Sequence, residues 1–240
     1  MQISLIIPMY NERGIIADTA LRLSQYMSEH FDSYEILFSD DGSTDGCGDA
    51  VRELALPCVY VTGYPKNQGK GCAIRTAMLE ARGDFVLFTD ADLAYGTDVI
   101  GQIYTFYQRE NESKPVQMVT GSRTLHQDGY SGYSVIRKLM SKVYIRVLCV
   151  VGGFRLSDSQ CGCKGFSRDA ARNIFSRCQV NGFAFDFEAI LWAECLGYRI
   201  LEFPVQVVNH RDSKVHIFRD SIRMLLDLRR IRKSVRKQSL

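Results

Sequence analysis

The sequence predicts an α/β fold with a mostly parallel central sheet flanked by helices. Short apolar runs alternate with segments of helical periodicity through the first half of the 240-residue chain. This alternation is typical of βαβ units with right-handed crossovers. Clusters of polar residues follow successive apolar runs, as expected where parallel strands end at the ligand-binding edge of a sheet.

Five apolar runs in the first half are predicted to be strands, because parallel strands buried on both faces are continuous in apolar residues. They are residues 3–7, 34–39, 58–62, 85–89 and 116–121. The intervening segments have helical spacing or helix-start signals, which predicts helices between the strands. These are residues 15–31, a short segment after Asp45-Gly46, residues 70–81 and residues 98–110.

The second half is less regular. We expect an amphipathic stretch at 137–151, a strand that ends near Phe166, helices at 168–178 and 186–196, and a strand at 198–208. Residues 215–240 are predicted to form a basic amphipathic C-terminal helix, with helical spacing as far as residue 237. Because no repeat, low-complexity segment or Pro/Gly linker divides the chain, we predict a single domain over residues 1–240.

The composition indicates a soluble globular protein, with 46% hydrophobic and 24% charged residues. No apolar run approaches the ~20 residues that span a bilayer. Met1-Gln2-Ile3 leads directly into a predicted strand, without the basic and apolar regions of a signal peptide. The eight cysteines have irregular spacing, which favours reduced thiols over a disulfide framework or a zinc site. We therefore expect a cytoplasmic protein.

Positive charge is concentrated at the C-terminus. Residues 214–240 contain nine Lys or Arg and two Asp, a net +7, so the rest of the chain carries −4 of the total +3. A basic amphipathic helix can lie on an anionic membrane surface, whereas no nucleic-acid-binding motif accompanies the charge. We expect peripheral contact with the cytoplasmic membrane face, supported by the 137–151 stretch. The alternative is that both helices pack on the sheet and the arginines are solvated.

Asp90-Ala91-Asp92 directly follows the apolar run at 85–89. Carboxylates one residue apart project to the same side of an extended backbone, where they repel each other unless a cation lies between them. Mg²⁺ is bound by one or two carboxylates together with substrate phosphates. The motif therefore predicts Mg²⁺ or Mn²⁺ held by Asp90 and Asp92 on a diphosphate. The alternative is a solvated acidic turn.

The other predicted strand ends also carry polar groups, at residues 8–12, 40–45, 66–71 and 121–123. Asp40 or Asp41 can accept a hydrogen bond from a base N–H or a ribose hydroxyl, whereas residues 43–45 fit an Asx turn and a helix N-cap. Lys70 lies at a helix start, where free N–H groups favour an anion; it is either a surface lysine or a phosphate contact. Neither the P-loop spacing nor G-x-G-x-x-G is present.

These motifs together resemble those of family 2 glycosyltransferases, which have the GT-A type nucleotide-sugar-binding fold. They are Pro8-Met9-Tyr10-Asn11-Glu12, Asp40-Asp41-Gly42-Ser43-Thr44-Asp45, Asn67-Gln68-Gly69-Lys70-Gly71 and Asp90-Ala91-Asp92. Later segments resemble the polyprenyl-phosphate glycosyltransferases, among them the dolichyl-phosphate β-glucosyltransferases. These segments are Gly121-Ser122-Arg123, Asp158-Ser159-Gln160-Cys161-Gly162-Cys163-Lys164, Phe185-Asp186-Phe187-Glu188 and Ser213-Lys214. The resemblance covers roughly residues 2–230.

The resemblance implies a role for each matching position. The nucleotide sugar would be bound by Pro8, Tyr10, Glu12, Asp40, Asp41, Lys70, Asp90 and Ala91, and the divalent metal by Asp90 and Asp92. Arg123 and Lys214 would bring cationic groups near phosphates. Asp158 and Gln160 would lie near the transferred sugar and the acceptor phosphate, and Asp186 would face the site. These last five residues form the expected catalytic set.

The resemblance also implies the reaction: inverting transfer of a hexose, most simply glucose, from a nucleotide diphosphate sugar such as UDP-glucose to a polyprenyl phosphate. A phosphate monoester has a second pKa of about 6, so this acceptor needs no strong general base. Transfer to a saccharide or other hydroxyl would need one, with Asp158 or Asp186 in that role. The remaining alternatives are a non-catalytic nucleotide-sugar-binding protein and a nucleotidyltransferase.

Overall fold

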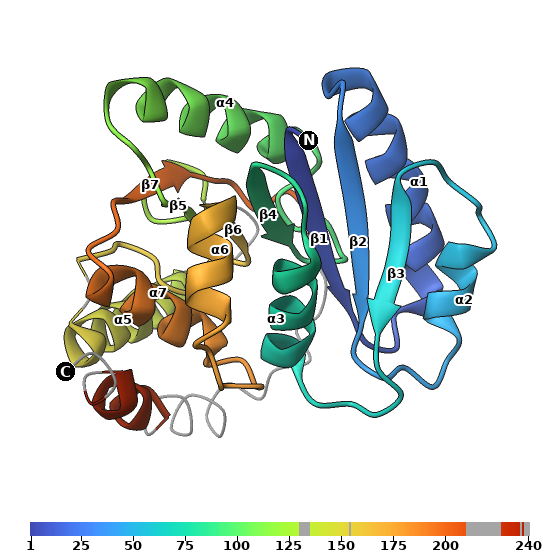
Figure 1. The fold of residues 1–240 in the computed structure, drawn as a ribbon. Helices are drawn as coiled ribbons and strands as arrows, with labels where there is room; N and C mark the ends of the chain where they lie inside the picture. The colour runs from blue at the N-terminus through green and yellow to red at the C-terminus, as the bar shows by residue number, and fades with distance from the viewer. Residues whose placement is uncertain (130–134, 154, 210–226, 236, 238–240) are drawn as a thin grey trace.

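A seven-stranded sheet forms the centre of the computed structural model, which describes residues 1–129, 135–153, 155–209, 227–235 and 237. The order of the strands across the sheet is β3-β2-β1-β4-β6-β5-β7 (Figure 1). The strands are β1 (Ile3–Met9), β2 (Tyr34–Asp40), β3 (Val59–Gly63), β4 (Phe85–Thr89), β5 (Met118–Ser122), β6 (Cys163–Ser167) and β7 (Ile200–Pro204).

The sheet is mostly parallel, as predicted. β1 pairs in parallel with β2 and β4, β2 pairs with β3, and β5 pairs with β7. β6 is antiparallel to both of its neighbours, β4 and β5. As a result, β6 begins at the edge where the parallel strands end: Cys163, its first residue, pairs with Thr89, the last residue of β4.

Helices cover both faces of the sheet (Figure 1). On one face, α1 (Arg13–His30), α2 (Cys47–Arg52) and α4 (Asp98–Ser113) contribute to a buried apolar cluster. On the other, a second cluster contains residues of α3 (Lys70–Glu80), α5 (Val135–Gly152), α6 (Arg168–Phe175) and α7 (Phe185–Cys195). Residues 227–235 form a further helix, which packs into the second cluster through Leu228, Ile231 and Val235.

Successive residues of the central strands serve the two clusters in turn. In β1, Leu5 and Ile7 belong to the cluster with α1, and Ile6 belongs to the cluster with α3. In β4, Leu87 belongs to the cluster with α1, and Phe88 belongs to the cluster with α3. Both faces of these strands are therefore buried, which is why their sequences are continuous apolar runs.

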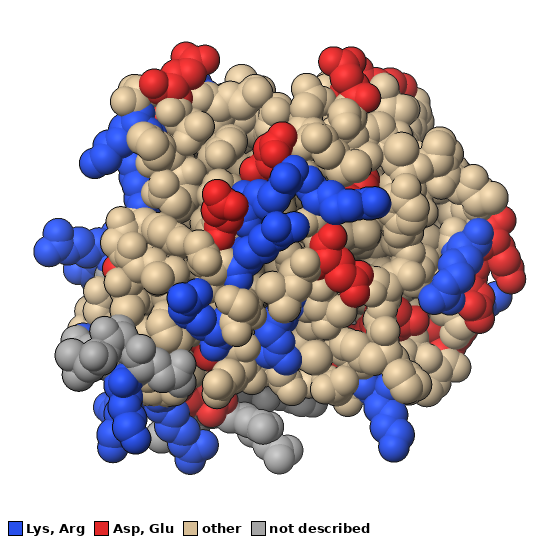
Figure 2. All heavy atoms as spheres, in the orientation of Figure 1, with Lys and Arg blue, Asp and Glu red and all other residues tan. Residues whose placement is uncertain are grey.

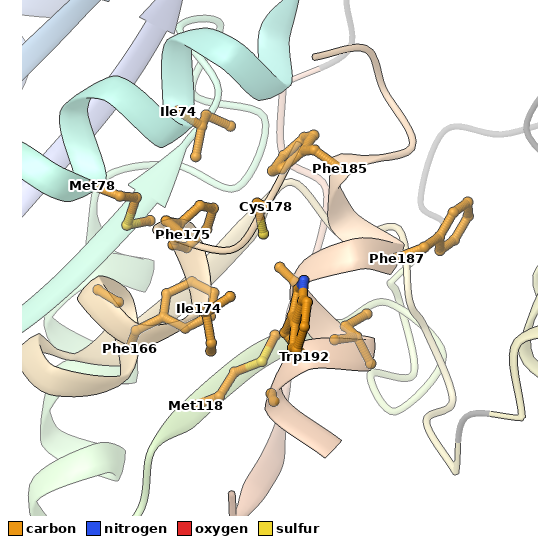
Figure 3. Close-up of a cluster of buried hydrophobic side chains, with 14 of the residues drawn as sticks. Ile74, Met78, Met118, Phe166, Ile174, Phe175, Cys178, Phe185, Phe187 and Trp192 are labelled. Carbon is orange, nitrogen blue, oxygen red and sulfur yellow. The ribbon is translucent and has the colours of Figure 1, made fainter. Parts of the chain in front are cut away.

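Figure 3 shows the second cluster, where Met78 of α3, Phe175 of α6 and Trp192 of α7 lie together. Phe166 of β6 and Phe175 meet edge to face, with ring centroids 5.3 Å apart, a geometry that aromatic pairs favour. This packing holds α6 and α7 against the sheet. It thereby positions the first turn of α7, which carries Asp186.

Most predicted elements agree with the structure to within a few residues. β4 has the predicted bounds, and α3 ends one residue earlier than predicted. The strand predicted at 198–208 is shorter, since β7 covers only Ile200–Pro204. Of the predicted C-terminal helix at 215–240, residues 227–235 are helical, and residues 215–226 lie outside the described part of the chain.

Candidate active site

The loops that carry the predicted site residues meet at one edge of the sheet. β1, β2 and β4 are parallel, so their carboxyl ends, followed by Tyr10, Asp41 and Asp90, lie at the same edge. β5 has the same direction and leads into Arg123. The antiparallel β6 brings the preceding segment, with Asp158, to this edge as well.

Three residues predicted to bind the nucleotide differ in accessibility. Pro8 is buried within β1, where it pairs with Ser39 of β2. Tyr10 is 41% exposed, so its ring is accessible to a ligand. Asp40 ends β2 half-buried, and its Oδ1 accepts a hydrogen bond from the Ser43 N–H at 2.9 Å.

Hydrogen bonds join the loops after β1 and β2. The Asn11 N–H donates to Ser43 Oγ at 3.0 Å, and the Thr44 N–H donates to Asn11 Oδ1 at 2.9 Å. Asp45 Oδ1 accepts from the Cys47 N–H at 3.0 Å, which is the Asx turn expected before α2. The two loops therefore form one wall of the site.

Asp41 is almost fully buried, with 4% exposure, and organises the loop that leads into α3. Its carboxylate accepts hydrogen bonds from Tyr64 Oη at 2.7 Å, from Asn67 Nδ2 at 2.7 Å and from the Gln68 N–H at 2.8 Å. The Gly69 N–H lies 3.0 and 2.9 Å from the two oxygens. The acceptor capacity of Asp41 is thus used within the protein.

The start of α3 differs from the sequence prediction of free N–H groups for a ligand anion. Asp41 already accepts from the Gly69 N–H. The N–H groups of Gly71 and Cys72 donate to the carbonyl oxygen of Asn181, at 2.7 and 3.3 Å. The protein's own acceptors therefore occupy this helix start, because the loop before α7 folds over it.

The backbone turns after Asp90, so the expectation of an extended Asp-x-Asp segment was wrong. The Leu93 N–H donates to the Asp90 carbonyl at 3.0 Å, and Leu93 has a positive φ of 49°. Asp92 Oδ1 accepts from the Ala94 N–H at 3.1 Å. Ala91 is buried, and its carbonyl accepts from Thr19 Oγ1 at 2.8 Å.

Lys70 supplies a positive charge to both carboxylates of this turn. Its Nζ forms an ion pair with Asp90 Oδ1. Burial acts to lower the pKa of Lys70, but the negative charges of Asp90, Asp186 and Asp92 outweigh burial and raise that pKa above its usual value. The ammonium group is therefore charged at neutral pH and faces three carboxylates.

Arg123 and Asp158 form a buried ion pair. Arg123 Nε and Nη2 donate to the two carboxylate oxygens at 2.7 and 3.0 Å, and the Arg123 N–H lies 3.2 Å from Oδ2. Burial raises the pKa of Asp158, but the charge of Arg123 outweighs it and holds that pKa below its ordinary value. The Gln160 N–H donates to Asp158 Oδ1 at 3.1 Å, so the pair also orders the backbone at Gln160.

Glu202 of β7 anchors the same segment and was missed by the sequence reasoning. Its carboxylate accepts from the Ser157 N–H at 2.8 and 3.0 Å and from the Asp158 N–H at 3.2 Å. Ser157 Oγ donates to Glu202 Oε1 at 2.7 Å. A glutamate inside a strand belongs to no recognisable motif, so only the fold connects it with the site.

Asp186 pairs with Lys164, a second residue to which the sequence reasoning assigned no role. Lys164 is fully buried, and its Nζ donates to Asp186 Oδ1 at 2.7 Å and to the Cys161 carbonyl at 2.5 Å. Burial raises the pKa of Asp186, although Lys164 and Lys70 act in the opposite direction. The available signal was that Lys164 directly follows Cys161-Gly162-Cys163, a segment predicted to be buried. A buried lysine needs an anionic partner.

Other predictions concern the C-terminal region. Lys214 lies outside the described residues. In the helix at 227–235, the apolar positions Leu228, Ile231 and Val235 are buried in the core, so the expectation that its apolar face meets lipid was wrong for this segment. Arg229, Arg230 and Lys233 are exposed, whereas Arg232 is half-buried and its Nη1 donates to the Val151 carbonyl oxygen at 2.8 Å. Figure 2 shows Lys and Arg side chains gathered at this corner of the molecule.

α5 presents apolar residues to solvent. Val143, Val147 and Val150 are 56%, 40% and 67% exposed, and their spacing places them on one side of the helix. Ile145 and Leu148, by contrast, are buried in the core. In the described ranges, no helix is both long enough and apolar enough to cross a membrane.

The described residues contain no group of three or more His, Cys, Asp or Glu that could hold a metal ion. The two carboxylates of Asp90 and Asp92, at the carboxyl end of β4, are the ligands that the protein could offer to a divalent ion there. One or two carboxylates are what Mg²⁺ usually takes when substrate phosphates supply further oxygens.

Known proteins are similar in both sequence and fold. A dolichyl-phosphate beta-glucosyltransferase of Trichomonas vaginalis is 32% identical over 239 residues, which cover 95% of this chain and 72% of that protein. The dolichyl-phosphate beta-glucosyltransferase of Saccharomyces cerevisiae is 31% identical, with 94% and 72% covered. Both relatives thus match along nearly the whole chain.

Among solved structures, the glucosyl-3-phosphoglycerate synthase of Mycobacterium tuberculosis, in complex with Mn²⁺, UDP and glucosyl-3-phosphoglycerate, has a TM-score of 0.64 at 20% identity. The match covers 95% of this chain and 79% of that one. The GT-A type fold expected from the motifs is confirmed. The model of the family Glycosyl transferase family 2 matches residues 4–175. The chain therefore belongs to glycosyl transferase family 2.

Proposed function

We propose that this chain is an inverting glucosyltransferase. It moves glucose from a nucleotide diphosphate sugar to a polyprenyl phosphate of the dolichyl type, and UDP-glucose is the first candidate for the donor. The observation that carries the proposal is the similarity to dolichyl-phosphate beta-glucosyltransferases at about 30% identity over nearly the whole chain. A nucleotide diphosphate donor also fits an edge of the sheet that gathers acidic and basic side chains from successive strand ends.

The donor would lie across the carboxyl ends of β1, β2 and β4. Tyr10 offers an exposed ring for the base, and Asp40 retains a carboxylate oxygen for the base or ribose. Pro8, Glu12 and Ala91 would contribute shape and backbone, since Pro8 and Ala91 are buried and Glu12 begins the turn into α1. Asp41 would support this pocket indirectly, because its oxygens are engaged by the loop at 64–69.

Asp90 and Asp92 would hold Mg²⁺ or Mn²⁺ together with the donor diphosphate. When bound, such an ion neutralises charge on the departing diphosphate. The two carboxylates fit this requirement, since they lie in one turn and act on the same ammonium group. The solved synthase in complex with Mn²⁺ and UDP has the same fold, which supports a divalent ion here without choosing between the two metals.

A phosphate acceptor agrees with the weak basicity of Asp158, one of the two candidate general bases of the site. Asp158 is fully buried, and its lowered pKa and bidentate bond to Arg123 make it a poor proton acceptor. A dianionic phosphate needs no such base, because its second pKa is about 6. We propose that Arg123 acts through Asp158 and the Gln160 backbone to shape the acceptor side, and that Lys214 adds a cation there.

One observation favours a hydroxyl acceptor instead. Burial raises the pKa of Asp186, which would make this carboxylate a stronger base. Lys164 opposes that role, because its ammonium group holds Asp186 Oδ1 at 2.7 Å. A hydroxyl acceptor is therefore the second candidate, and it predicts an activity that rises with pH through the pKa of one carboxylate.

A lipid acceptor requires the protein to reach a membrane, and we propose that it does so as a peripheral protein on the cytoplasmic face. The exposed valines of α5 would enter the interface, while basic residues meet anionic headgroups. Val150 and Val151 share a groove of about 530 Å³ with Arg229, Arg232 and Lys233. The apolar stripe and the basic face are thus adjacent, which supports a shared contact with lipid.

The reaction is tested with UDP-[¹⁴C]glucose, a short polyprenyl phosphate and Mn²⁺ or Mg²⁺. Label should enter the lipid phase, the new linkage should be β, and chelation should abolish transfer. Asp92→Ala should lower the rate about 100-fold or more, as expected for loss of one charge-stabilising group, whereas Asp18→Asn on the exposed face of α1 should not. Undiminished transfer by Asp92→Ala would refute the proposed metal site. Transfer of glucose to saccharides but not to polyprenyl phosphate would refute the proposed acceptor.

A further inference from the structure

Lys70 and Asp90 are paired at the point where the metal would bind. Lys70 is the first residue of α3 and Asp90 directly follows β4, and their side chains are 25% and 31% exposed. The ammonium group bonds Asp90 Oδ1, one of the two oxygens of that carboxylate. A cation belonging to the chain itself therefore occupies part of the ligand set proposed for a divalent ion.

Three carboxylates act on the Lys70 ammonium group, and that group donates a hydrogen bond to Asp90. Asp186, one of the three, is itself bonded to the ammonium group of Lys164 at 2.7 Å. The other oxygen of Asp90 lies against Gly162, where an added Cβ would overlap it. One oxygen of Asp90 is thus close to the Gly162 backbone, and the other is bonded to Lys70.

A divalent ion on Asp90 and Asp92 would lie beside the same ammonium group. Like charges in partly buried surroundings repel strongly, and the bond between Lys70 and Asp90 would have to be given up. A nucleotide diphosphate changes this balance. Its phosphate oxygens are strong acceptors for an ammonium group, so they offer Lys70 a new partner close to its present position.

We propose that Lys70 competes with the divalent cation for Asp90 and is released by the donor diphosphate, so that metal and donor bind cooperatively. The inference rests on the proposed function, because it takes the metal and the diphosphate from it. Coupling between two ligands is reciprocal: the factor by which UDP raises the affinity for Mn²⁺ equals the factor by which Mn²⁺ raises the affinity for UDP. Lys70 would contribute part of that factor.

The test is a titration of the chelator-treated full chain with Mn²⁺, with free Mn²⁺ followed by its EPR signal, in the absence and in the presence of UDP. Lys70→Met keeps the length of the side chain and removes the charge. We expect it to bind Mn²⁺ alone about tenfold more tightly than the unchanged protein, within the range typical of coupled sites. The factor by which UDP tightens Mn²⁺ binding should shrink correspondingly.

Two further variants control the result. Lys70→Arg retains a cation, so without UDP it should bind Mn²⁺ less tightly than Lys70→Met does. Lys66→Met removes an equal charge from an exposed residue of the loop that precedes α3 and should leave Mn²⁺ affinity unchanged. An equal gain in both Met variants would overturn the proposal, because it would reflect net charge alone.

The remaining outcomes separate this inference from the proposed function. If UDP tightens Mn²⁺ binding by the same factor in Lys70→Met and in the unchanged protein, the competition is refuted and the metal-dependent donor site stands. If the unchanged protein binds no Mn²⁺ even with UDP, the metal site and the competition both fail.

Discussion

Arg123 binds both oxygens of the fully buried Asp158 carboxylate, through Nε and Nη2 at 2.7 and 3.0 Å, while its own side chain is 15% exposed. The pair joins the end of β5 to the segment before β6. Two strands that are adjacent in the sheet but far apart in the sequence are thus connected beside the proposed acceptor position. Removing either charge would break this two-bond ion pair, and removing Arg123 would leave the Asp158 carboxylate buried without it.

Asp158→Asn should lower the free energy of unfolding by about 3–5 kcal/mol at neutral pH, the usual cost of breaking a buried pair. The folded pKa of Asp158 lies below its ordinary value of 3.8, so the ionised carboxylate stabilises the fold above that pH, and this stabilisation is lost as the pH falls through the folded pKa. Urea unfolding from about pH 7 to about pH 3 measures the effect. The difference between the two proteins should narrow in acid; a constant difference contradicts this assignment.

Gly162→Ala should disturb Asp90, because the added Cβ would overlap Oδ2 of that carboxylate. We expect UDP-dependent Mn²⁺ affinity to fall about tenfold, as expected when a carboxylate ligand is displaced, with transfer activity falling at least as much. Gly14→Ala is the matched control, since nothing lies within 4 Å of a Cβ at that position; it should raise stability by up to about 1 kcal/mol. Unchanged metal affinity in Gly162→Ala would show that the contact does not matter.

Substitutions at Asp40 and Asp41 should have different effects, because Asp40 is expected to bind UDP and Asp41 is expected to stabilise the fold. Asp41→Asn removes charge from a carboxylate with four hydrogen-bonding partners, so it should cost about 1.5–3 kcal/mol of stability. Asp40→Asn should change stability by less than about 1 kcal/mol and instead weaken UDP binding. Thermal unfolding and calorimetric UDP titration of both variants measure the two effects. The reverse pattern would exchange the two roles.

The exposed valines of α5 should contribute to lipid binding. Burying about 60 Å² of apolar surface is worth about 1.5 kcal/mol, so changing Val143, Val147 and Val150 together to Ser should weaken binding to phosphatidylserine-containing vesicles about tenfold. Leu21→Ser, at a residue of α1 that is 49% exposed, is the control and should have no effect. Co-sedimentation at low and high salt separates the apolar and ionic parts. Equal binding by the triple variant would exclude α5 from the contact.

The local sequence pattern was sufficient to predict those segments whose structure depends on their own residues. The run at 85–89 is continuous in apolar residues because β4 is buried on both faces, and its predicted bounds agree with the structure. The polar residues after each strand were placed correctly at one edge, because parallel strands share a direction. Asp45 likewise forms its Asx turn within two residues along the chain, so no distant contact was needed.

Distant contacts decided the rest. The insertion of β6 between β4 and β5 depends on pairing between segments about 80 residues apart, and periodicity carries no information about such pairing. That insertion brings Gly162 and Lys164 to Asp90 and Asp186. The burial of Asp41, and the carbonyl of Asn181 at the start of α3, likewise depend on loops that meet only in the fold.

The sequence by itself determined the α/β class, the order of most elements and the family 2 motifs, because hydrophobic periodicity and turn chemistry are local properties of a chain. Only the tertiary structure decided how the charges are used. It paired Lys70 with Asp90, Arg123 with Asp158 and Lys164 with Asp186. The physical reason is that a charge removed from water requires a partner within a few ångströms, and packing selects that partner from segments that the sequence keeps far apart.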